Sequence, residues 1–397
     1  MTPVSRALLI GVASSRRRHV DLDELEALAR SAGLQPTLRV MCSRSRADPA
    51  TRIGSGKVEE IHRQIAAEHI TEVVFDEALS AVHQRNLHRV WRVPVLDRTE
   101  LILEIFARRA ISQEGQAQVE LARLQHQSTR LVRMWTHLER QRGGIGVRGG
   151  PGERQIELDR RMLDTRIRRL RERLGALALQ RRTRRKARDR HGAFKVSLVG
   201  YTNAGKSTLF NALVGSQAPA YAADQLFATL DTLSRRVRLG EGNAFVLSDT
   251  VGFVRDLPHS LVNAFQATLE ETAQADLLLH LIDASSPERE RQCEAVEAVL
   301  REIGAGEVPV LKVYNKCDRC GLAPRADRDP YGRIFQVHAS AQTRAGIDLI
   351  REAIFQALTQ AAAQVTSRIL PEAIAQSSAA VVVGGARAGT VAAGRLP

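Results

Sequence analysis

The residues from Gly200 to Ser207, GYTNAGKS, constrain the fold of this chain more than any other stretch. They match the phosphate-binding pattern of a glycine, four free residues and Gly-Lys-Ser. Such a loop lets successive backbone N–H groups face an anion at the start of a helix, where the helix dipole favours negative charge. An apolar run, KVSLV (195–199), precedes the loop, and a helical pattern, TLFNALVG (208–215), follows it. This strand–loop–helix order predicts a nucleoside triphosphate site in an α/β domain.

The whole loop and the residue after it are expected to contact the nucleotide. Lys206 would reach the β- and γ-phosphates, and the hydroxyl of Ser207 would ligand Mg²⁺. The backbone N–H groups of the loop would donate to the phosphate oxygens. The expected binding residues are Gly200, Tyr201, Thr202, Asn203, Ala204, Gly205, Lys206, Ser207 and Thr208.

Two motifs downstream supply the remaining parts of a magnesium-dependent switch. A threonine in the polar segment after the loop can close over the γ-phosphate and ligand Mg²⁺; Thr229 is favoured and Thr232 is the alternative. An apolar strand then delivers Asp249 to the metal through a water molecule, and the N–H of Gly252 can contact the γ-phosphate. The predicted metal ligands are Ser207, Thr229 and Asp249, and the predicted catalytic residues are Lys206, Thr229 and Gly252.

The motif NKCD (315–318) at the end of a predicted strand selects the base. The carboxylate of Asp318 can accept hydrogen bonds from N1–H and the N2 amine of guanine, which adenine cannot supply. Asn315 can tie the base edge to the phosphate loop, and the stem of Lys316 can pack along the ring. The backbone of Ser340 and Ala341 can donate to guanine O6. The expected nucleotides are therefore GTP and GDP.

Phe253 stands where Ras-like GTPases place a glutamine that orients the attacking water. A phenyl ring cannot polarise water. Intrinsic hydrolysis is therefore expected to be slow and to depend on something that a partner supplies or orders.

Residues 1–110 alternate between short apolar runs and amphipathic helical patterns, beginning with ALLIGVA (7–13). This alternation predicts a small parallel α/β sheet. GSGK (54–57) resembles the end of a second phosphate loop, but Thr51 stands where the first glycine would be. A helix-capping turn is therefore the favoured interpretation.

Residues 111–191 carry two long helical patterns on either side of RGGIGVRGGPGE (142–153). Apolar residues on alternating three- and four-residue steps give each pattern a coiled-coil seam. The sequence therefore predicts an antiparallel helical hairpin, whose tip, 142–153, is too rich in glycine to be helical. The seam residues are Leu121, Leu124, Leu131, Trp135, Leu138, Ile156, Leu163, Ile167, Leu170, Leu174 and Leu177.

Positive charge gathers on this hairpin. The chain of 397 residues has a formal net charge of +14. Arginines crowd between residues 154 and 190, and Arg142 and Arg148 lie in the tip. Arginine clusters and backbone N–H groups bind phosphates, so RNA is the expected partner, with a merely solvated arginine-rich helix as the alternative. RRTRRKARDR (181–190) is expected to link the hairpin to the nucleotide-binding domain, 192–360.

The last stretch, 361–397, is rich in alanine and glycine, and we predict that it is disordered. The chain has four cysteines, a sparse usage typical of a reducing compartment. No run reaches the roughly 18 consecutive apolar residues that span a bilayer, which leaves only peripheral membrane contact open. We expect a monomeric, cytoplasmic protein.

Several longer motifs resemble those of the HflX family of translational GTPases. They are LDRTELILEIFARRA (96–110), RLVRMWTHLERQRGGIGVRGGPGE (130–153), VGYTNAGKSTLFN (199–211), DTVGFVRDLPHSLVNAF (249–265) and NKCD (315–318). The resemblance implies an N-terminal α/β domain, a helical hairpin and a Ras-like G domain. It also implies GTP-dependent binding to the large ribosomal subunit and its rRNA, and splitting of stalled or idle ribosomes under stress. A ribosome-binding module with vestigial hydrolysis is the alternative.

The chain departs from the family pattern at three places. Arg154 and Leu158 stand where the family usually has threonines, and LDT (230–232) lacks the usual proline. The tail, 361–397, is unlike the folded C-terminal extension of many relatives, which puts any contact made by that extension in doubt.

Overall fold

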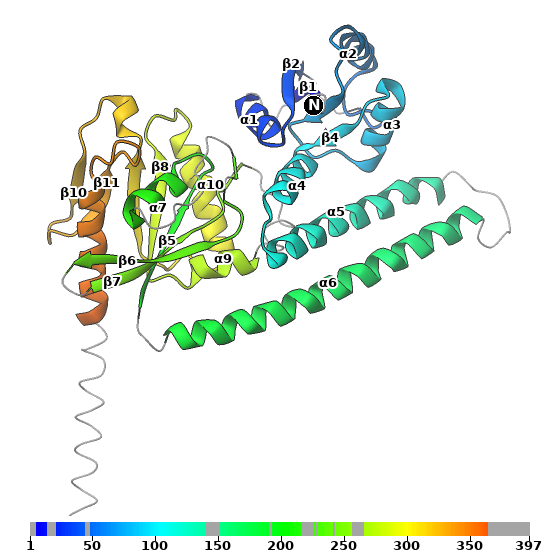
Figure 1. Cartoon of the computed structure of the whole chain (residues 1–397). Coiled ribbons are helices and arrows are strands. Elements are labelled where there is room, and N and C mark those ends of the chain that lie inside the picture. The colour runs from blue at the N-terminus through cyan, green and yellow to red at the C-terminus, as the bar shows by residue number, and fades with distance from the viewer. Residues whose placement is uncertain are drawn as a thin grey trace, which may run out of the picture.

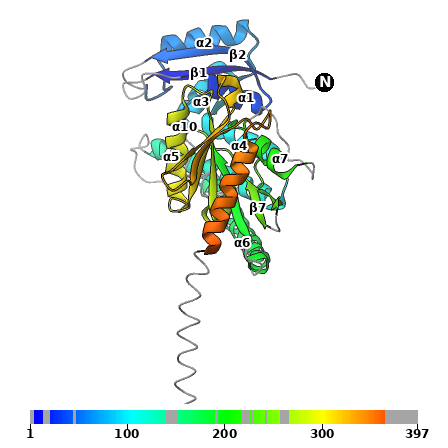
Figure 2. The same cartoon turned by 90° about the vertical axis from the view of Figure 1, so that its left-hand side faces the viewer.

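The structure is a computed structural model that describes residues 5–13, 21–43, 48–139, 151–189, 193–215, 226–227, 229–240, 243–255 and 266–363. Two β-sheets flanked by helices lie next to each other, and a pair of long helices runs along them (Figure 1). Seen from the side, the N-terminal sheet is stacked above the larger second sheet (Figure 2). The predicted α/β fold with a helical middle region is confirmed.

The N-terminal sheet has four parallel strands in the order β2-β1-β3-β4. Alternate residues of β1 face opposite sides because successive side chains of a strand point in opposite directions. Leu9 packs against α1 and α4 on one face, and Leu8 and Ile10 pack against α2 and α3 on the other. The elements are β1 (Arg6–Ala13), α1 (Asp23–Ser31), β2 (Gln35–Ser43), α2 (Ser55–Ala67), β3 (Glu72–Phe75), α3 (Ala81–Trp91), β4 (Val95–Asp97) and α4 (Arg98–Arg109).

Two local features of this sheet bear on the sequence predictions. Helix α2 starts at Ser55 with Gly54 as its N-cap, as the helix-capping interpretation of that stretch predicts. Helix α4 was not predicted as a separate element. It starts with a capping box in which Asp97 accepts from the N–H of Glu100 and Glu100 accepts from the N–H of Asp97, so the strand passes into a helix with no loop.

The two long helices of the middle region are α5 (Gln113–Glu139) and α6 (Pro151–Asp189), and they pack along each other. Their buried contact residues include Leu121, Leu124, Ile167 and Leu170, all of the predicted seam. Leu163 and Leu174 pack against these residues from the edge. The side chains of the remaining first-helix seam residues and of Ile156 lie outside the described residues.

The prediction of a non-helical tip loop over 142–153 is wrong at its C-terminal end, because residues 151–153 form the first turn of α6. Pro151 suits that position: the first helical residue needs no N–H donor, and proline presets its φ angle. Residues 142–150, with Arg142 and Arg148, lie outside the described residues. The expected linker 181–190 is likewise helical as far as Asp189.

The second sheet has seven strands in the order β10-β11-β9-β8-β5-β7-β6. The five central strands are parallel, and β6 and β10 join the edges antiparallel. A helix over residues 347–363, orange in Figure 2, covers one face, so the predicted tail begins inside this helix at residues 361–363. The rest of that tail lies outside the described residues. The other elements are β5 (Phe194–Gly200), α7 (Lys206–Val214), β6 (Leu233–Gly240), β7 (Asn243–Asp249), α9 (Gln266–Ala273), β8 (Leu277–Asp283), α10 (Arg289–Glu302), β9 (Val310–Asn315), η1 (Cys317–Cys320), β10 (Arg325–Arg328) and β11 (Ile334–His338).

One hydrophobic core continues from the N-terminal sheet into the second sheet. It joins α1 and α4 to Leu226, Phe227 and Leu230 and to Val251 and Phe253, the segments that flank the phosphate loop. The ring of Phe227 meets that of Phe106 of α4 edge-on, with the ring centroids 4.6 Å apart. No helix among the described residues is both long and apolar enough to cross a membrane.

Candidate nucleotide site

The phosphate loop leaves the end of β5 and enters α7, and only glycine fits its two ends. Gly200 and Gly205 have φ angles of 149° and 95°. A Cβ at Gly200 would lie 2.3 Å from the carbonyl oxygen of Leu281, and one at Gly205 would lie 2.2 Å from the side-chain nitrogen of Asn315. The loop is therefore held against two neighbouring strands at a distance that no side chain allows.

Lys206, the first residue of α7, points its amine into the loop. The Nζ atom donates to the carbonyl oxygens of Gly200 at 3.1 Å and Tyr201 at 2.7 Å. Burial lowers the pKa of this amine to about 8, and the carboxylate of Asp249 opposes part of that shift. A buried cation that bonds only to neutral carbonyls is set up to gain from an anionic ligand.

Three oxygen atoms converge next to Lys206. The hydroxyl oxygens of Ser207 and Thr229 lie 2.9 Å apart, and they lie 2.8 and 2.9 Å from Oδ2 of Asp249. Adjacent ligands of an octahedral Mg²⁺ ion are about 3 Å apart. Burial raises the pKa of Asp249, and its second oxygen, Oδ1, makes no hydrogen bond within the described part of the chain. The two hydroxyls, at this spacing, fit neighbouring ligands of a magnesium ion, and the carboxylate of Asp249 lies beside them, where it can hold a water molecule on the ion.

Gly252 lies directly against the loop. A Cβ at this position would be 2.8 Å from Cγ2 of Thr202 and 2.9 Å from Nζ of Lys206. The hydroxyl of Thr202 is buried and has no hydrogen-bond partner among the described residues. The predicted γ-phosphate contact and the predicted lysine thus occupy the same small region.

The backbone of Phe253 is hydrogen-bonded to the phosphate loop, and its ring is buried. Its N–H donates to the carbonyl of Gly200 at 3.2 Å, and its carbonyl accepts from the N–H of Thr202 at 2.7 Å. Its side chain is only 1% exposed and belongs to the core shared with the N-terminal sheet. The residue after Gly252 therefore faces the N-terminal region and cannot take up the position of a water-orienting side chain.

The base-selecting residues gather at the ends of β9 and β11. Asn315 donates from Nδ2 to the carbonyl of Ala204 at 2.8 Å and so ties this edge to the phosphate loop, as predicted from the motif. Lys316 is paired through Nζ with Asp283 at 2.8 Å. Asp318 is exposed in the short helix η1 and open to a ligand.

The two backbone groups expected to bind guanine O6 already have acceptors. The N–H of Ser340 donates to the carbonyl of Ala345, and the N–H of Ala341 donates to Oδ1 of Asn315, each at 2.9 Å. Donation to a base from Ser340 or Ala341 would require these bonds to exchange, so it stays a prediction.

The phosphate loop also contacts the N-terminal sheet, which no motif in the sequence predicts. The hydroxyl of Tyr201 donates to Glu24 of α1 and accepts from the N–H of Arg255 at 2.6 Å. Burial raises the pKa of Tyr201, so the phenol stays neutral. No sequence motif predicts what a tyrosine in a phosphate loop contacts. The contact between Tyr201 and Glu24 depends on how the two sheets are placed relative to each other.

Family models match three consecutive parts of the chain. They are described as GTP-binding GTPase N-terminal (residues 19–107), GTP-binding GTPase Middle Region (109–188) and 50S ribosome-binding GTPase (195–316). The phosphate loop, Gly252 and the first two residues of NKCD, Asn315 and Lys316, lie in the third part, which ends just before Asp318.

Relatives and solved structures agree with these matches. The chain is 50% identical over 353 residues to the GTPase HflX of Escherichia coli strain K12, covering 89% of this chain and 82% of the relative. It is 49% identical over 340 residues to the GTPase HflX of Magnetococcus marinus, covering 86% and 78%. A crystal structure of the protein SsGBP with GDP shares the fold at a TM-score of 0.51 and 26% identity, over 90% of this chain and 99% of that one. With its three parts in this order and half of its residues identical to a relative along most of its length, the chain belongs to the HflX family of GTPases.

Proposed function

We propose that this chain binds GTP with Mg²⁺ at the phosphate loop and hydrolyses it to GDP and phosphate. The observation that carries this proposal is the convergence of the oxygens of Ser207, Thr229 and Asp249 beside the buried amine of Lys206. Phosphoryl transfer needs little covalent chemistry from a protein; it needs donors and cations placed where negative charge develops. This site supplies them.

Each residue has a separate task in that step. Lys206 exchanges its two carbonyl partners for phosphate oxygens and neutralises their charge. The N–H of Gly252 donates to the γ-phosphate. Ser207, Thr229 and, through water, Asp249 would hold Mg²⁺, which supplies further positive charge to the phosphates. The carboxylate of Asp318 accepts from the guanine edge, so that the site prefers GTP to ATP.

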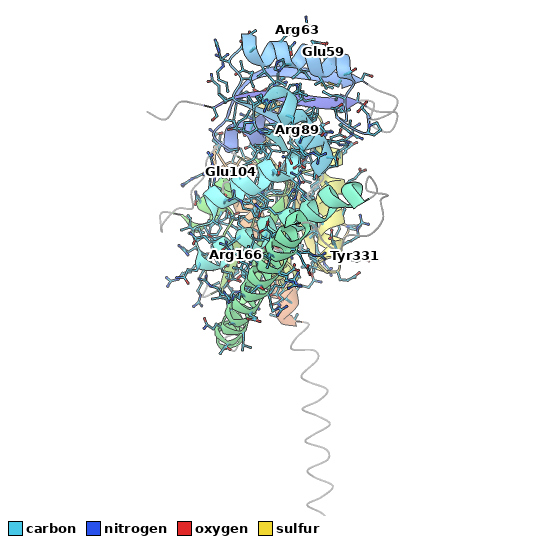
Figure 3. The ribbon with its side chains drawn as sticks, turned by 90° about the vertical axis from the view of Figure 1, so that its right-hand side faces the viewer. Glu59, Arg63, Arg89, Glu104, Arg166 and Tyr331 are labelled. Carbon is cyan, nitrogen blue, oxygen red and sulfur yellow. The ribbon has the colours of Figure 1, made fainter. Side chains whose placement is uncertain are left out.

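Hydrolysis is proposed to be slow in the isolated protein, because Phe253 is buried in the interdomain core. Its acceleration is assigned to the large ribosomal subunit. Two findings support this partner: the third part of the chain matches a model described as a 50S ribosome-binding GTPase, and α6 carries seven exposed arginines between residues 160 and 173. These are Arg160, Arg161, Arg166, Arg168, Arg169, Arg171 and Arg173, with Arg166 labelled in Figure 3.

In this proposal the hairpin contacts rRNA, and GTP-dependent binding dissociates stalled or idle ribosomes, as expected under stress. The basic hairpin, with Arg142 and Arg148 toward its tip, would approach the phosphate backbone of the RNA. A monomer in the cytoplasm suffices for this activity.

A second candidate function is a nucleotide-dependent ribosome-binding module whose hydrolysis is vestigial. The burial of Phe253 favours this binding module over an enzyme that hydrolyses GTP efficiently without a partner. The addition of large ribosomal subunits distinguishes the two: a large rise in GTP turnover supports the enzyme, and no rise supports the module.

The test of the ribosomal function is sedimentation of ribosomes with the protein and either GTP or a non-hydrolysable analogue. Wild type should bind large subunits and split ribosomes in the presence of the triphosphate. Lys206→Ala should do neither, and deletion of residues 143–152 should abolish splitting. If the deletion variant binds and splits ribosomes as well as wild type does, the proposed hairpin contact is wrong.

A further inference from the structure

Residues 226–227 and 229–232, on either side of and including Thr229, are held by elements far from them in sequence. The N–H of Leu226 donates to Oγ of Ser31 in α1 at 3.0 Å. Phe227 meets Phe106 of α4, as described above. Asp231 reaches in a further direction, to the start of the long helix α5.

Asp231 forms a cap on the N-terminal end of α5. Its Oδ2 atom accepts from the N–H groups of Ile111 at 3.0 Å and Ser112 at 2.9 Å, and its Oδ1 atom accepts from the hydroxyl of Ser112. The same hydroxyl accepts from the N–H of Gly115 at 2.9 Å. Asp231 therefore places a carboxylate at the positive end of a helix, on N–H groups that need acceptors.

The fit at this cap is close enough to require a glycine in the helix. A Cβ at Gly115 would lie 2.5 Å from Oδ1 of Asp231, so any larger residue displaces the carboxylate. Glycine inside a helix costs about 1 kcal/mol relative to alanine. Gly115 has no positive φ angle that would otherwise call for glycine. The close approach of Asp231 is the reason for a glycine here.

The cap and the magnesium ligand are joined by very little chain. Asp231 lies two residues after Thr229, and two residues span at most about 7 Å. The two residues cannot separate by more than this distance, so a displacement of Thr229 from Ser207 and Asp249 by several ångströms moves Asp231 as well. Helix α5 starts beside the second sheet and leads away from it to the far end of the helix pair (Figure 1).

We propose that Asp231 couples the nucleotide site to the helical hairpin: it caps α5 firmly while Thr229 is held at the metal site and loosens when Thr229 is released. The inference rests on the proposed part of Thr229 in the magnesium site. Because coupling between two sites is reciprocal, a partner that tilts α5 must also change how well Thr229 is held. Asp231 is thus a positioning residue, which acts on the nucleotide through Thr229.

The test is hydrogen–deuterium exchange of the full chain with Mg²⁺ and either GDP or the slowly hydrolysed analogue GTPγS. The readout is the exchange rate of peptides containing the amides of Ile111 and Ser112. In wild type, exchange should be at least about fivefold slower with GTPγS than with GDP. In Asp231→Ala the two nucleotides should give the same, faster rate.

Gly115→Ala provides an independent variant. It displaces the carboxylate of Asp231 but leaves the amino-acid sequence around Thr229 unchanged. It should also abolish the difference between the nucleotides. Gly175→Ala is the matched control: Gly175 lies in the partner helix α6 with nothing within 4 Å of an added Cβ. Gly175→Ala brings the same gain in helix propensity. Its peptides containing Ile111 and Ser112 should show the same hydrogen–deuterium exchange rates as those of wild type.

Two results would overturn the coupling: equal exchange with both nucleotides in wild type, or a nucleotide difference that survives in Asp231→Ala. Thr229→Ala separates this failure from failure of the proposed magnesium site. If Thr229→Ala weakens GTPγS binding and Asp231→Ala still shows the nucleotide difference, only the coupling fails. If Thr229→Ala binds GTPγS with Mg²⁺ as tightly as wild type does, the proposed magnesium ligand itself is wrong.

Discussion

The two parallel sheets of this protein use the same edge for different purposes. In parallel α/β sheets the carboxyl ends of the strands form the edge at which ligands bind. Polar residues lie at this edge in both sheets: Asp76 directly after β3, Asp97 at the end of β4, and Asp249 at the end of β7 beside the loop from Gly200. The edges differ in what faces these groups.

In the N-terminal sheet, other parts of the chain supply the charges at this edge. Arg98 is 4% exposed and pairs with Asp76 at 2.9 Å and with Glu24 at 2.8 Å. It also donates to the carbonyl of Arg255 beyond the phosphate loop at 3.1 Å. Arg130 of α5 reaches Asp97 at 2.6 Å. This edge therefore holds the N-terminal sheet against both helix α5 and the segment of the second domain that contains Arg255.

In the second sheet, the groups around the phosphate loop are not paired with guanidinium groups in this way, although Lys316 and Asp283 form an ion pair farther along the same edge. Lys206 bonds to backbone carbonyls. Among the residues that the structure describes, neither Oδ1 of Asp249 nor the buried hydroxyl of Thr202 has a hydrogen-bond partner. The comparison suggests a simple rule. An edge whose carboxylates face guanidinium groups of the same chain is a joint, and an edge that leaves a buried cation facing only carbonyls is a ligand site.

The largest expected effect is the loss of nucleotide binding in Lys206→Ala. This change removes charge-assisted contacts to two phosphates, so GTP affinity should fall by about a thousandfold. Titration of a fluorescent GDP or GTP analogue measures it. The nucleotide-free variant should unfold no more easily than wild type, because wild type keeps a desolvated amine there. Undiminished affinity would mean that this edge is not the phosphate site.

Arg98→Met should destabilise the N-terminal joint by up to about 3 kcal/mol, because it removes the buried cation of Asp76 and Glu24 and leaves them only the more exposed Arg255. Urea unfolding measures this free energy. The double variant Arg98→Met with Asp76→Asn should recover part of the loss. If the single variant instead lowers GTP affinity as much as Lys206→Ala and leaves stability unchanged, the N-terminal edge is a ligand site after all.

Asp318→Asn should weaken GTP binding by about a hundredfold, because an amide cannot accept two hydrogen bonds from the guanine edge. Xanthosine triphosphate, which presents a carbonyl where guanine has an amine, should bind the variant better than wild type does. Competition titrations with both nucleotides check this exchange. A variant that still prefers GTP would show that the exposed Asp318 does not contact the base.

The smallest expected effect is a dependence of nucleotide affinity on pH. In the folded protein the pKa of Lys206 is lowered to about 8, so the amine is charged below that pH and neutral above it. Phosphate binding requires the charged form. GDP affinity should therefore fall about fivefold from pH 8 to pH 9, while Lys206→Arg, which stays charged, should lose less than about twofold. Equal losses in the two proteins would exclude Lys206 as the cause.

The sequence predicted the second sheet's site better than the N-terminal joint because motifs describe local geometry. Gly200, Lys206 and Asp249 each follow a strand in a fixed order, and that order places them at one edge. Asn315 also lies where its motif predicts, on the carbonyl of Ala204.

The contacts between the sheets could not be predicted in this way. Tyr201 with Glu24, and Asp231 with the start of α5, join residues that are 177 and about 120 positions apart. No periodicity or spacing encodes such pairs. The strands β6 and β10 were missed for a related reason: edge strands such as β6, which carries three arginines, lack the apolar run that marks a central strand.

The most direct test of the difference between the two edges is a calorimetric titration of the full chain with GDP and Mg²⁺. Wild type is predicted to bind one nucleotide per chain. Lys206→Ala should bind none at micromolar concentrations, and Arg98→Met should still bind one at temperatures where it remains folded. Binding that survives in Lys206→Ala but disappears in the folded Arg98→Met variant would place the nucleotide at the N-terminal edge and contradict this account.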